Sequence, residues 1–152
     1  MDLLDKAVDI FTKEGVDLVL HAGDFISPLT ANPLSSLQSD LVGVFGNNDG
    51  DKLFLRRRFE EESVGIIERG PHRLELGERT VFLMHEPRLL EVLERSSVPD
   101  LIVYGHTHEV DVRNGQPLVV NPGEVGGWLT GRSTVGLVDL DEMEVEIKEV
   151  AG

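Results

Sequence analysis

Short apolar runs alternate with amphipathic segments along the first half of the chain. Apolar residues recur at intervals of three and four within residues 1–15, which predicts a helix that ends at Gly15. Residues 16–24 and 40–49 are almost continuously apolar until they end in polar loops, which is typical of strands buried on both faces. Further helical segments are expected within residues 28–39, 50–62 and 87–97.

Strands dominate the second half of the chain. Residues 72–86 alternate on either side of Gly77 and Glu78, which predicts a hairpin. Other strands are expected within residues 100–108, 109–114, 116–124, 132–141 and 143–150. This order predicts an α/β fold, and residues 1–152 are expected to form a single domain because no repeat or linker interrupts them.

Composition and charge narrow the classes of function. The formal net charge is -14, and such a surface disfavours long nucleic acids because it repels their phosphates. Cysteine is absent, which excludes disulfides and thiolate metal sites. With no recognisable signal peptide and no apolar stretch long enough to span a membrane, a cytoplasmic protein is expected.

Side chains that can bind metals follow four of the apolar runs. These runs end in HAGD, FGNND, MHE and GHTH, so one chemical pattern recurs four times. Ligands in open α/β sheets collect beyond the carboxyl ends of the strands. Glycines before Asp24, Asn47 and His106 permit sharp turns at these ends. The four loops are therefore expected to converge on one crevice.

The loops supply one carboxylate, one amide oxygen and three imidazoles. The candidate metal ligands are Asp24, Asn47, His85, His106 and His108. This set suits Mn, Ni, Fe or Zn and is too rich in nitrogen for Ca or Mg. Each motif alone is also compatible with a turn or a hydrogen-bonded histidine, and His21 and His72 are assigned only such roles. The recurrence of the pattern favours a metal site.

The motifs HAGDF, GNNDG, MHE, YGHTHE and NPGE followed by LTGR resemble those of the calcineurin-like metallophosphoesterases, especially their small archaeal and bacterial phosphodiesterases. The resemblance covers nearly the whole chain and implies a four-layer α/β/β/α sandwich with two metal ions at the strand ends. It also implies that Asp24 bridges the ions and that His108 serves one of them. The other ion would be held by Asp24 together with Asn47, His85 and His106.

One part of the family pattern is absent from this sequence. Members normally open with a strand that ends in Asp-x-His, which supplies two ligands to the ion that His108 serves. Here residues 1–15 already predict the first helix. One complete metal site, a weak or empty second site and impaired activity are therefore expected. A start assigned at an internal methionine is favoured over a natural short form, and another copy of the chain or a rearranged segment is expected to cover the gap.

The reaction implied by the resemblance is phosphoester hydrolysis by a metal-activated water. Relatives that cleave monoesters often have a histidine after the ligand asparagine, but Asn48 stands there and has no acidic proton. Small diesters or esters with good leaving groups are therefore the expected substrates, unless Asp49 supplies the proton. A non-catalytic interaction module on the same fold, like the small phosphoesterase-like subunit of the retromer coat, and a plain metal-binding protein are the alternatives. Trp128 is expected to pack in the core.

Overall fold

The structure, a computed structural model, describes residues 2–25, 31–47, 49 and 51–150. The helices are α1 (Leu3–Glu14), α2 (Ala31–Leu34), α3 (Lys52–Glu61), the 3-10 helix η2 (Pro87–Leu89) and α4 (Leu90–Ser96). The first strands are β1 (Leu18–His21), β2 (Asp40–Val44), β3 (Ile66–Glu68), β4 (His72–Leu76) and β5 (Arg79–Leu83). The later strands are β6 (Leu101–Val103), β7 (Val110–Arg113), β8 (Leu118–Pro122), β9 (Thr134–Asp139) and β10 (Glu144–Glu149).

Helix α1 follows the apolar spacing of the sequence. Asp2 Oδ1 accepts a hydrogen bond of 2.7 Å from the N–H of Leu3 at the start of the helix. Gly15 ends it in the left-handed conformation, with a φ of 63°. Ala7 and Val8 are the buried residues between these ends, as expected from the periodicity. No helix within the described ranges is long and apolar enough to cross a membrane.

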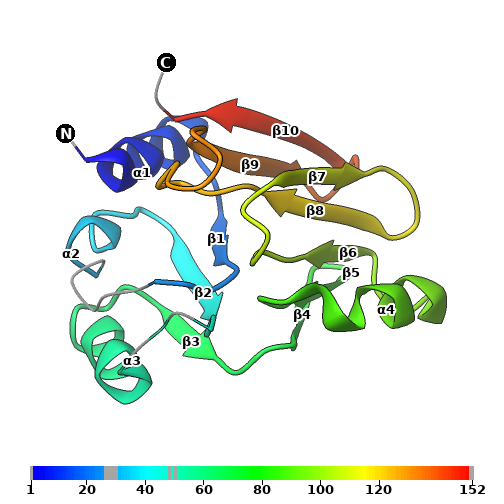
Figure 1. The fold of residues 1–152 in the computed structure, drawn as a ribbon, viewed down its shortest axis with the longest axis horizontal. Helices are drawn as coiled ribbons and strands as arrows, with labels where there is room; N and C mark the ends of the chain where they lie inside the picture. The colour runs from blue at the N-terminus through cyan, green and yellow to red at the C-terminus, as the bar shows by residue number, and fades with distance from the viewer. Residues whose placement is uncertain (1, 26–30, 48, 50, 151–152) are drawn as a thin grey trace.

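The strands form two main sheets and a separate hairpin (Figure 1). The first sheet has the order β1-β2-β3 and is wholly parallel. The second has the order β4-β5-β6-β8-β7, in which β5, β6 and β8 are parallel and the two outer strands are antiparallel to their neighbours. Strands β9 and β10 pair with each other in antiparallel fashion. The carboxyl ends of the parallel strands carry the candidate loops.

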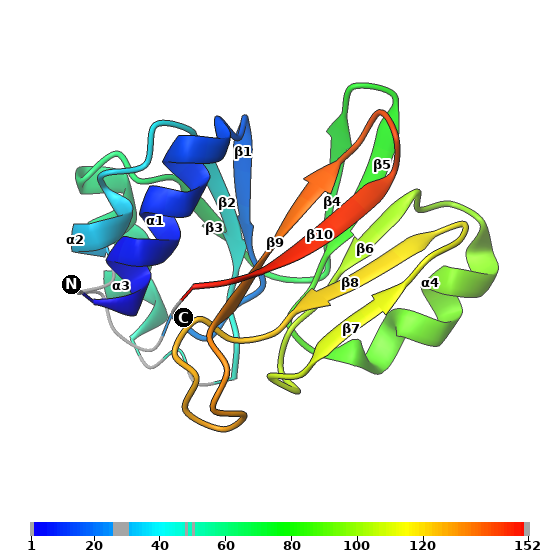
Figure 2. The ribbon, with the colours of Figure 1, turned by 90° about the horizontal axis from the view of Figure 1, so that it is seen from above.

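The two sheets lie between two layers of helices (Figure 2). The core between the first sheet and helices α1 to α3 includes Val8, Val19, Leu41, Phe59 and Ile67. The core between the two sheets includes Val42, Val44, Val81, Leu101 and Val103. The core under α4 includes Leu90, Ile102 and Tyr104. Both faces of the central strands are therefore covered, which explains their continuous apolar runs and confirms the predicted α/β/β/α sandwich.

Three local features differ from expectation. Strand β3 has only three residues and is not predicted by the apolar pattern. Within residues 31–39, the described part of a predicted helix and loop, α2 spans only four residues. Trp128 was expected in the core, but its side chain is 86% exposed, and that of Leu129 is 74% exposed. Polar contacts to Glu124 hold this loop, so its shape does not depend on burial of the indole.

Strand β1 lies at an edge of its sheet. As far as the described residues go, β1 pairs only with β2, and β9 pairs only with β10. The β9–β10 hairpin lies between the two sheets in the view of Figure 2. The covering of the β1 edge by another copy of the chain or by a rearranged segment stays a prediction.

His21, in β1, has a partly buried ring that does not readily take up a proton. The ring stacks on Phe25 with 3.7 Å between the centroids, and Nδ1 accepts a hydrogen bond of 3.1 Å from the N–H of Gly23. Burial lowers the pKa of His21 to about 4, against the opposing effect of the carboxylates of Asp49 and Asp24. The assignment of His21 to a local hydrogen bond therefore agrees with the structure.

The lowered pKa makes the free energy of unfolding depend on pH. As pH falls from 6.5 to about 4, the unfolded chain takes up a proton that the folded His21 does not, so stability is lost in this window. The loss reaches at most about 1.4 kcal/mol per pH unit. Urea titrations across the window should therefore show a shallower decline for His21→Gln than for the wild type. His72→Gln, at the start of β4, is the control, and equal slopes for His21→Gln and the wild type would contradict this assignment.

Candidate metal centre and active site

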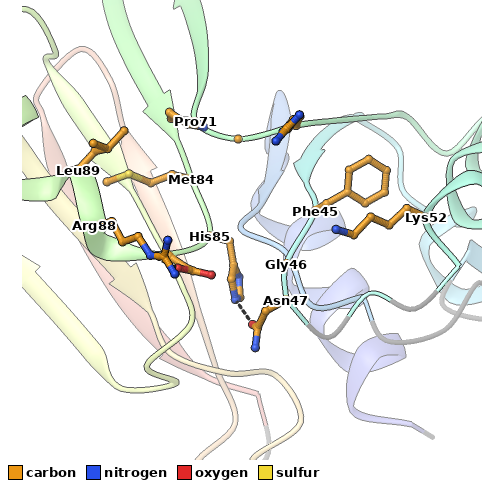
Figure 3. Close-up of a pocket in the computed structure, with 12 residues that line it drawn as sticks. Phe45, Gly46, Asn47, Lys52, Pro71, Met84, His85, Arg88 and Leu89 are labelled. Carbon is orange, nitrogen blue, oxygen red and sulfur yellow. Dashed lines mark hydrogen bonds and ion pairs between the residues drawn. The ribbon is translucent and has the colours of Figure 1, made fainter.

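His85 joins the loops of the two sheets. It lies just beyond β5, is 7% exposed, and its Nδ1 is 2.7 Å from the carbonyl oxygen of Ala22, just beyond β1. Because a carbonyl oxygen only accepts hydrogen bonds, Nδ1 carries the proton and Nε2 keeps its lone pair. This Nε2 points across the gap between the sheets toward Asn47, from the loop after β2 (Figure 3).

Three further nitrogen and oxygen atoms surround Nε2 of His85. Asn47 Oδ1 lies at 2.7 Å and His106 Nδ1 at 3.2 Å. Asp24 Oδ2 lies at 3.5 Å, and Asn47 Oδ1 is itself 3.3 Å from His106 Nδ1. Four loops that are distant in the sequence thus bring a carboxylate, an amide oxygen and two imidazoles together.

A divalent cation fits this arrangement. Where lone pairs of such atoms face one another at these distances, they repel unless a proton or a positive ion lies among them. Among the described residues, histidine, aspartate and glutamate side chains do not by themselves form a group of three that could hold a metal. The donors around Nε2 of His85 also include the amide oxygen of Asn47, at 2.7 Å. Such mixed nitrogen and oxygen donors are those preferred by Mn, Fe, Ni or Zn.

The backbone is strained where these side chains are presented. Asp24, His106 and His108 have φ values of 59°, 66° and 63°, in the left-handed region that residues other than glycine seldom adopt. Each such conformation costs about 1–3 kcal/mol and persists only where surrounding contacts enforce it. Among the described residues, three of the six non-glycine residues with positive φ are therefore candidate metal ligands.

Asp49 holds two of the strained loops together. Its side chain is buried, and its Oδ2 accepts hydrogen bonds from the N–H of Gly46 at 2.6 Å and of Asp24 at 3.1 Å. Gly46 lies so close to Asp24 that a Cβ on it would be 2.2 Å from Oδ1 of Asp24. Asp49 therefore has a structural role, and proton donation by Asp49 stays a prediction. Asn48, the other candidate catalytic residue, lies outside the described residues.

His108 has a different partner from the other candidates. Its Nδ1 is 2.7 Å from Oε2 of Glu124, in the loop after β8. The other oxygen of Glu124 accepts the N–H groups of Leu129 at 2.8 Å and Thr130 at 2.9 Å, and the Thr130 hydroxyl at 3.0 Å. Burial acts to raise the pKa of Glu124, but these donors together hold it below its usual value. No hydrogen bond or ion pair within the described part of the chain joins His108 to Asn47, His85 or His106.

The chain matches the calcineurin-like phosphoesterase superfamily domain over residues 1–143. The protein belongs to the calcineurin-like phosphoesterase family. It is 34% identical over 142 residues to a phosphodiesterase of Methanocaldococcus jannaschii, a match that covers 91% of this chain and 86% of the relative.

Solved structures of phosphoesterases and related proteins share the fold. A structure described as a novel archaeal phosphodiesterase matches with a TM-score of 0.90 and 32% identity, over 97% of this chain and 91% of that one. Vacuolar protein sorting 29 from Cryptosporidium parvum matches with a TM-score of 0.61 and 20% identity, over 93% of this chain and 84% of that one. At this identity the second likeness concerns the fold alone.

Membership of the calcineurin-like phosphoesterase family implies divalent metal ions, which the donors around His85 fit. The candidate residues that the structure brings together are Asp24, Asn47, His85 and His106. It places His108 against Glu124. The sequence pattern assigned no role to Glu124, although the NPGE motif contains it, and did not reveal that the carbonyl of Ala22 orients His85. The ligand roles themselves stay predictions.

Substitution of Gly46 should weaken metal binding because the new Cβ would collide with Asp24. The backbone N of Asp24 would lie 2.4 Å from this Cβ, and Asp49 prevents the loops from separating. Titration calorimetry with manganese should show a loss of affinity of about 10-fold or more for Gly46→Ala. Gly77→Ala is the control, because its Cβ would meet nothing within 4 Å and would add only backbone strain. Equal manganese affinities for the two variants would exclude this role of Gly46.

Removal of the Glu124 carboxylate should destabilise the fold. Glu124→Ala leaves the N–H groups of Leu129 and Thr130 and the imidazole of His108 without their acceptor. The free energy of unfolding should fall by about 2–4 kcal/mol, measured by urea titration. Glu109→Ala, at an exposed position in the neighbouring loop, should change it by no more than about 0.5 kcal/mol. A similar small change for both variants would show that the Glu124 contacts add little.

Proposed function

We propose that this protein is a metal-dependent phosphodiesterase that acts on small phosphodiesters. The observation that carries the proposal is the convergence of Asn47, His106 and Asp24 within 3.5 Å of Nε2 of His85. The 34% identity to the phosphodiesterase of Methanocaldococcus jannaschii supports it. A net charge of -14 favours small substrates over long nucleic acids, because an acidic surface repels a polyanion.

Four side chains would hold one divalent ion, Mn, Ni, Fe or Zn. They are those of Asp24, Asn47, His85 and His106. A bound divalent ion supplies a water of lowered pKa as nucleophile and neutralises charge on the phosphate oxygens. The carbonyl of Ala22 keeps His85 in the tautomer that presents Nε2. Asn47 contributes an oxygen without charge, so the site remains electrophilic.

The lack of an evident proton donor favours diesters with good leaving groups. Hydrolysis joins the oxygen of water to phosphorus and breaks the bond to one ester oxygen, which leaves as an alcohol with a proton or as an alkoxide. Asn48 has no acidic proton to give. The carboxylate of Asp49 accepts two backbone N–H groups through its Oδ2, as expected for a structural carboxylate. Substrates whose alcohols leave without protonation, such as phenyl esters, should therefore react fastest.

A second ion is proposed beside His108. The contact between Nδ1 of His108 and Glu124 orients the ring and leaves Nε2 to bind a ligand. Of the ligands that the family resemblance implies for this ion, the sequence supplies only His108 and the shared Asp24. We propose that His108 and the shared Asp24 are the ligands that residues 1–152 supply to this second ion.

Hydrolysis of bis-p-nitrophenyl phosphate tests the proposed function. With added manganese or nickel, the wild-type protein should release p-nitrophenolate, measured by its absorbance. Asn47→Ala and His85→Ala should each lower kcat/KM by about 100-fold or more, because each removes a donor from the central set. His72→Ala alters a histidine outside the site and should match the wild type.

A version of the protein extended upstream with an Asp-x-His strand provides a second arm of this experiment. Higher activity in the extended protein than in residues 1–152 alone would support a contribution of such a motif to the second ion. Absence of hydrolysis in both proteins, with manganese binding shown by calorimetry, would contradict the phosphodiesterase proposal.

A non-catalytic interaction module is the second candidate function. The exposed side chains of Trp128 and Leu129 favour it, because neighbouring large apolar residues on a surface often mark a protein contact. Metal binding without hydrolysis, as described above, would support this function over the first.

A further inference from the structure

A pocket of about 460 Å³ opens beside the contact between His85 and Asn47. One wall comes from the end of β2 and the start of α3, and the opposite wall from the segment after β5 (Figure 3). The link between β3 and β4 contributes a third side through Arg69 and Pro71. The pocket therefore adjoins the candidate metal centre and extends beyond the four donor side chains.

The charge of this pocket is opposite to that of the whole protein. Its lining includes the cations Lys52, Arg69 and Arg88 but only one carboxylate, that of Glu86, in a chain with a net charge of -14. Arg88 Nε is 2.7 Å from Oε2 of Glu86. Lys52 and Arg69 form no ion pair with any residue in the described ranges. This local excess of positive charge would attract an anion into a cleft of an otherwise repulsive surface.

Two of the cations lie on opposite sides of the metal-donor pair. Lys52 lies on the Asn47 side and Arg88 on the His85 side, and the nitrogen ends of both side chains turn toward the space between them (Figure 3). The amino group of Lys52 also lies 5.8 Å from the centre of the Phe45 ring. An anion in this space could contact both walls of the pocket while a second phosphate lies at the metal donors.

The pocket also has apolar walls. Phe45 lines it on the Lys52 side, and Met84 and Leu89 line it on the Arg88 side (Figure 3). Leu89 is 43% exposed, so apolar surface here is open to a ligand. Ligand pockets commonly combine apolar walls with a few polar groups that fix the orientation of the ligand. A flat ring with an attached phosphate matches both features.

We propose that this pocket selects phosphodiesters in which one ester substituent carries a ring and a second phosphate group. Lys52, Arg69 and Arg88 bind the second phosphate, and Phe45 and Met84 contact the ring. This inference rests on the proposed phosphodiesterase function, because it places the phosphate to be hydrolysed at Asn47 and His85. The second phosphate is bound but not cleaved.

Binding of two nucleotides that differ by one phosphate tests the pocket directly. Calorimetry on the manganese-loaded protein compares thymidine 3′,5′-bisphosphate with thymidine 5′-phosphate. The bisphosphate should bind about 10-fold more tightly at low salt, because two additional charge-assisted contacts form. The double variant Lys52→Gln with Arg69→Gln should lose most of this preference. Arg57→Gln removes a cation of α3 that does not line the pocket and should retain the preference.

Equal affinities for the two nucleotides in the wild type would overturn the inference. A preference that persists in the double variant would also overturn it, and would indicate that the metal centre alone binds both phosphates. These substitutions are at exposed positions, so loss of folding is not expected to obscure the result.

Hydrolysis separates failure of this inference from failure of the proposed function. The substrates are thymidine 5′-(p-nitrophenyl phosphate) and the same ester with a 3′-phosphate. A higher kcat/KM for the second substrate, reduced in the double variant, supports the inference. Hydrolysis of both at equal rates leaves the phosphodiesterase function intact and contradicts the pocket assignment. A preference in binding without hydrolysis of either ester supports the pocket and contradicts the phosphodiesterase function.

Discussion

The contact between Nδ1 of His85 and the carbonyl oxygen of Ala22 is the interaction on which the site depends. It joins the carboxyl end of β5 in one sheet to that of β1 in the other. It also determines which imidazole nitrogen keeps a lone pair. With the opposite tautomer, Nε2 would donate a proton to Asn47 and close the site with an ordinary hydrogen bond. The carbonyl of Ala22 therefore joins the two sheets and also leaves Nε2 of His85 as an acceptor that faces Asn47.

The same region shows why the surrounding fold must be rigid. Asp24 and His106 adopt left-handed backbone conformations that residues other than glycine seldom adopt. Asp49 and the absence of a side chain on Gly46 let two loops approach closely enough to enforce this geometry at Asp24. Glu124 does the same for the loop that faces His108. The backbone conformations at the proposed metal site are locally unfavourable, and contacts between loops offset the free-energy cost of this strain.

The charge of the pocket differs from that of the whole protein, and this difference bears on the proposed substrate. The protein as a whole is strongly acidic, whereas the pocket next to His85 has an excess of cations. This cleft therefore attracts an anion more than the acidic surface around it does, which favours a compact substrate over an extended polyanion. Apolar side chains lie beside the cations, and they favour binding of a substrate that also has a flat organic group.

The sequence by itself determined the elements with strong local patterns and the family. Regular spacing and Gly15 were sufficient for α1, and alternation around Gly77 was sufficient for the β4–β5 hairpin. The recurring polar ends of apolar runs correctly indicated that Asp24, Asn47, His85 and His106 would meet. These features can be predicted from the sequence because each depends on residues that are close together in the chain.

Only the tertiary structure decided the remaining features. Strand β3 is too short to show a period, and the exposure of Trp128 depends on a loop held by Glu124. The partners Ala22 and His85 are 63 positions apart, and His108 and Glu124 are 16 apart. Which side chain faces which acceptor follows from the packing of the two sheets. That packing is a property of the whole chain, and no local pattern specifies it.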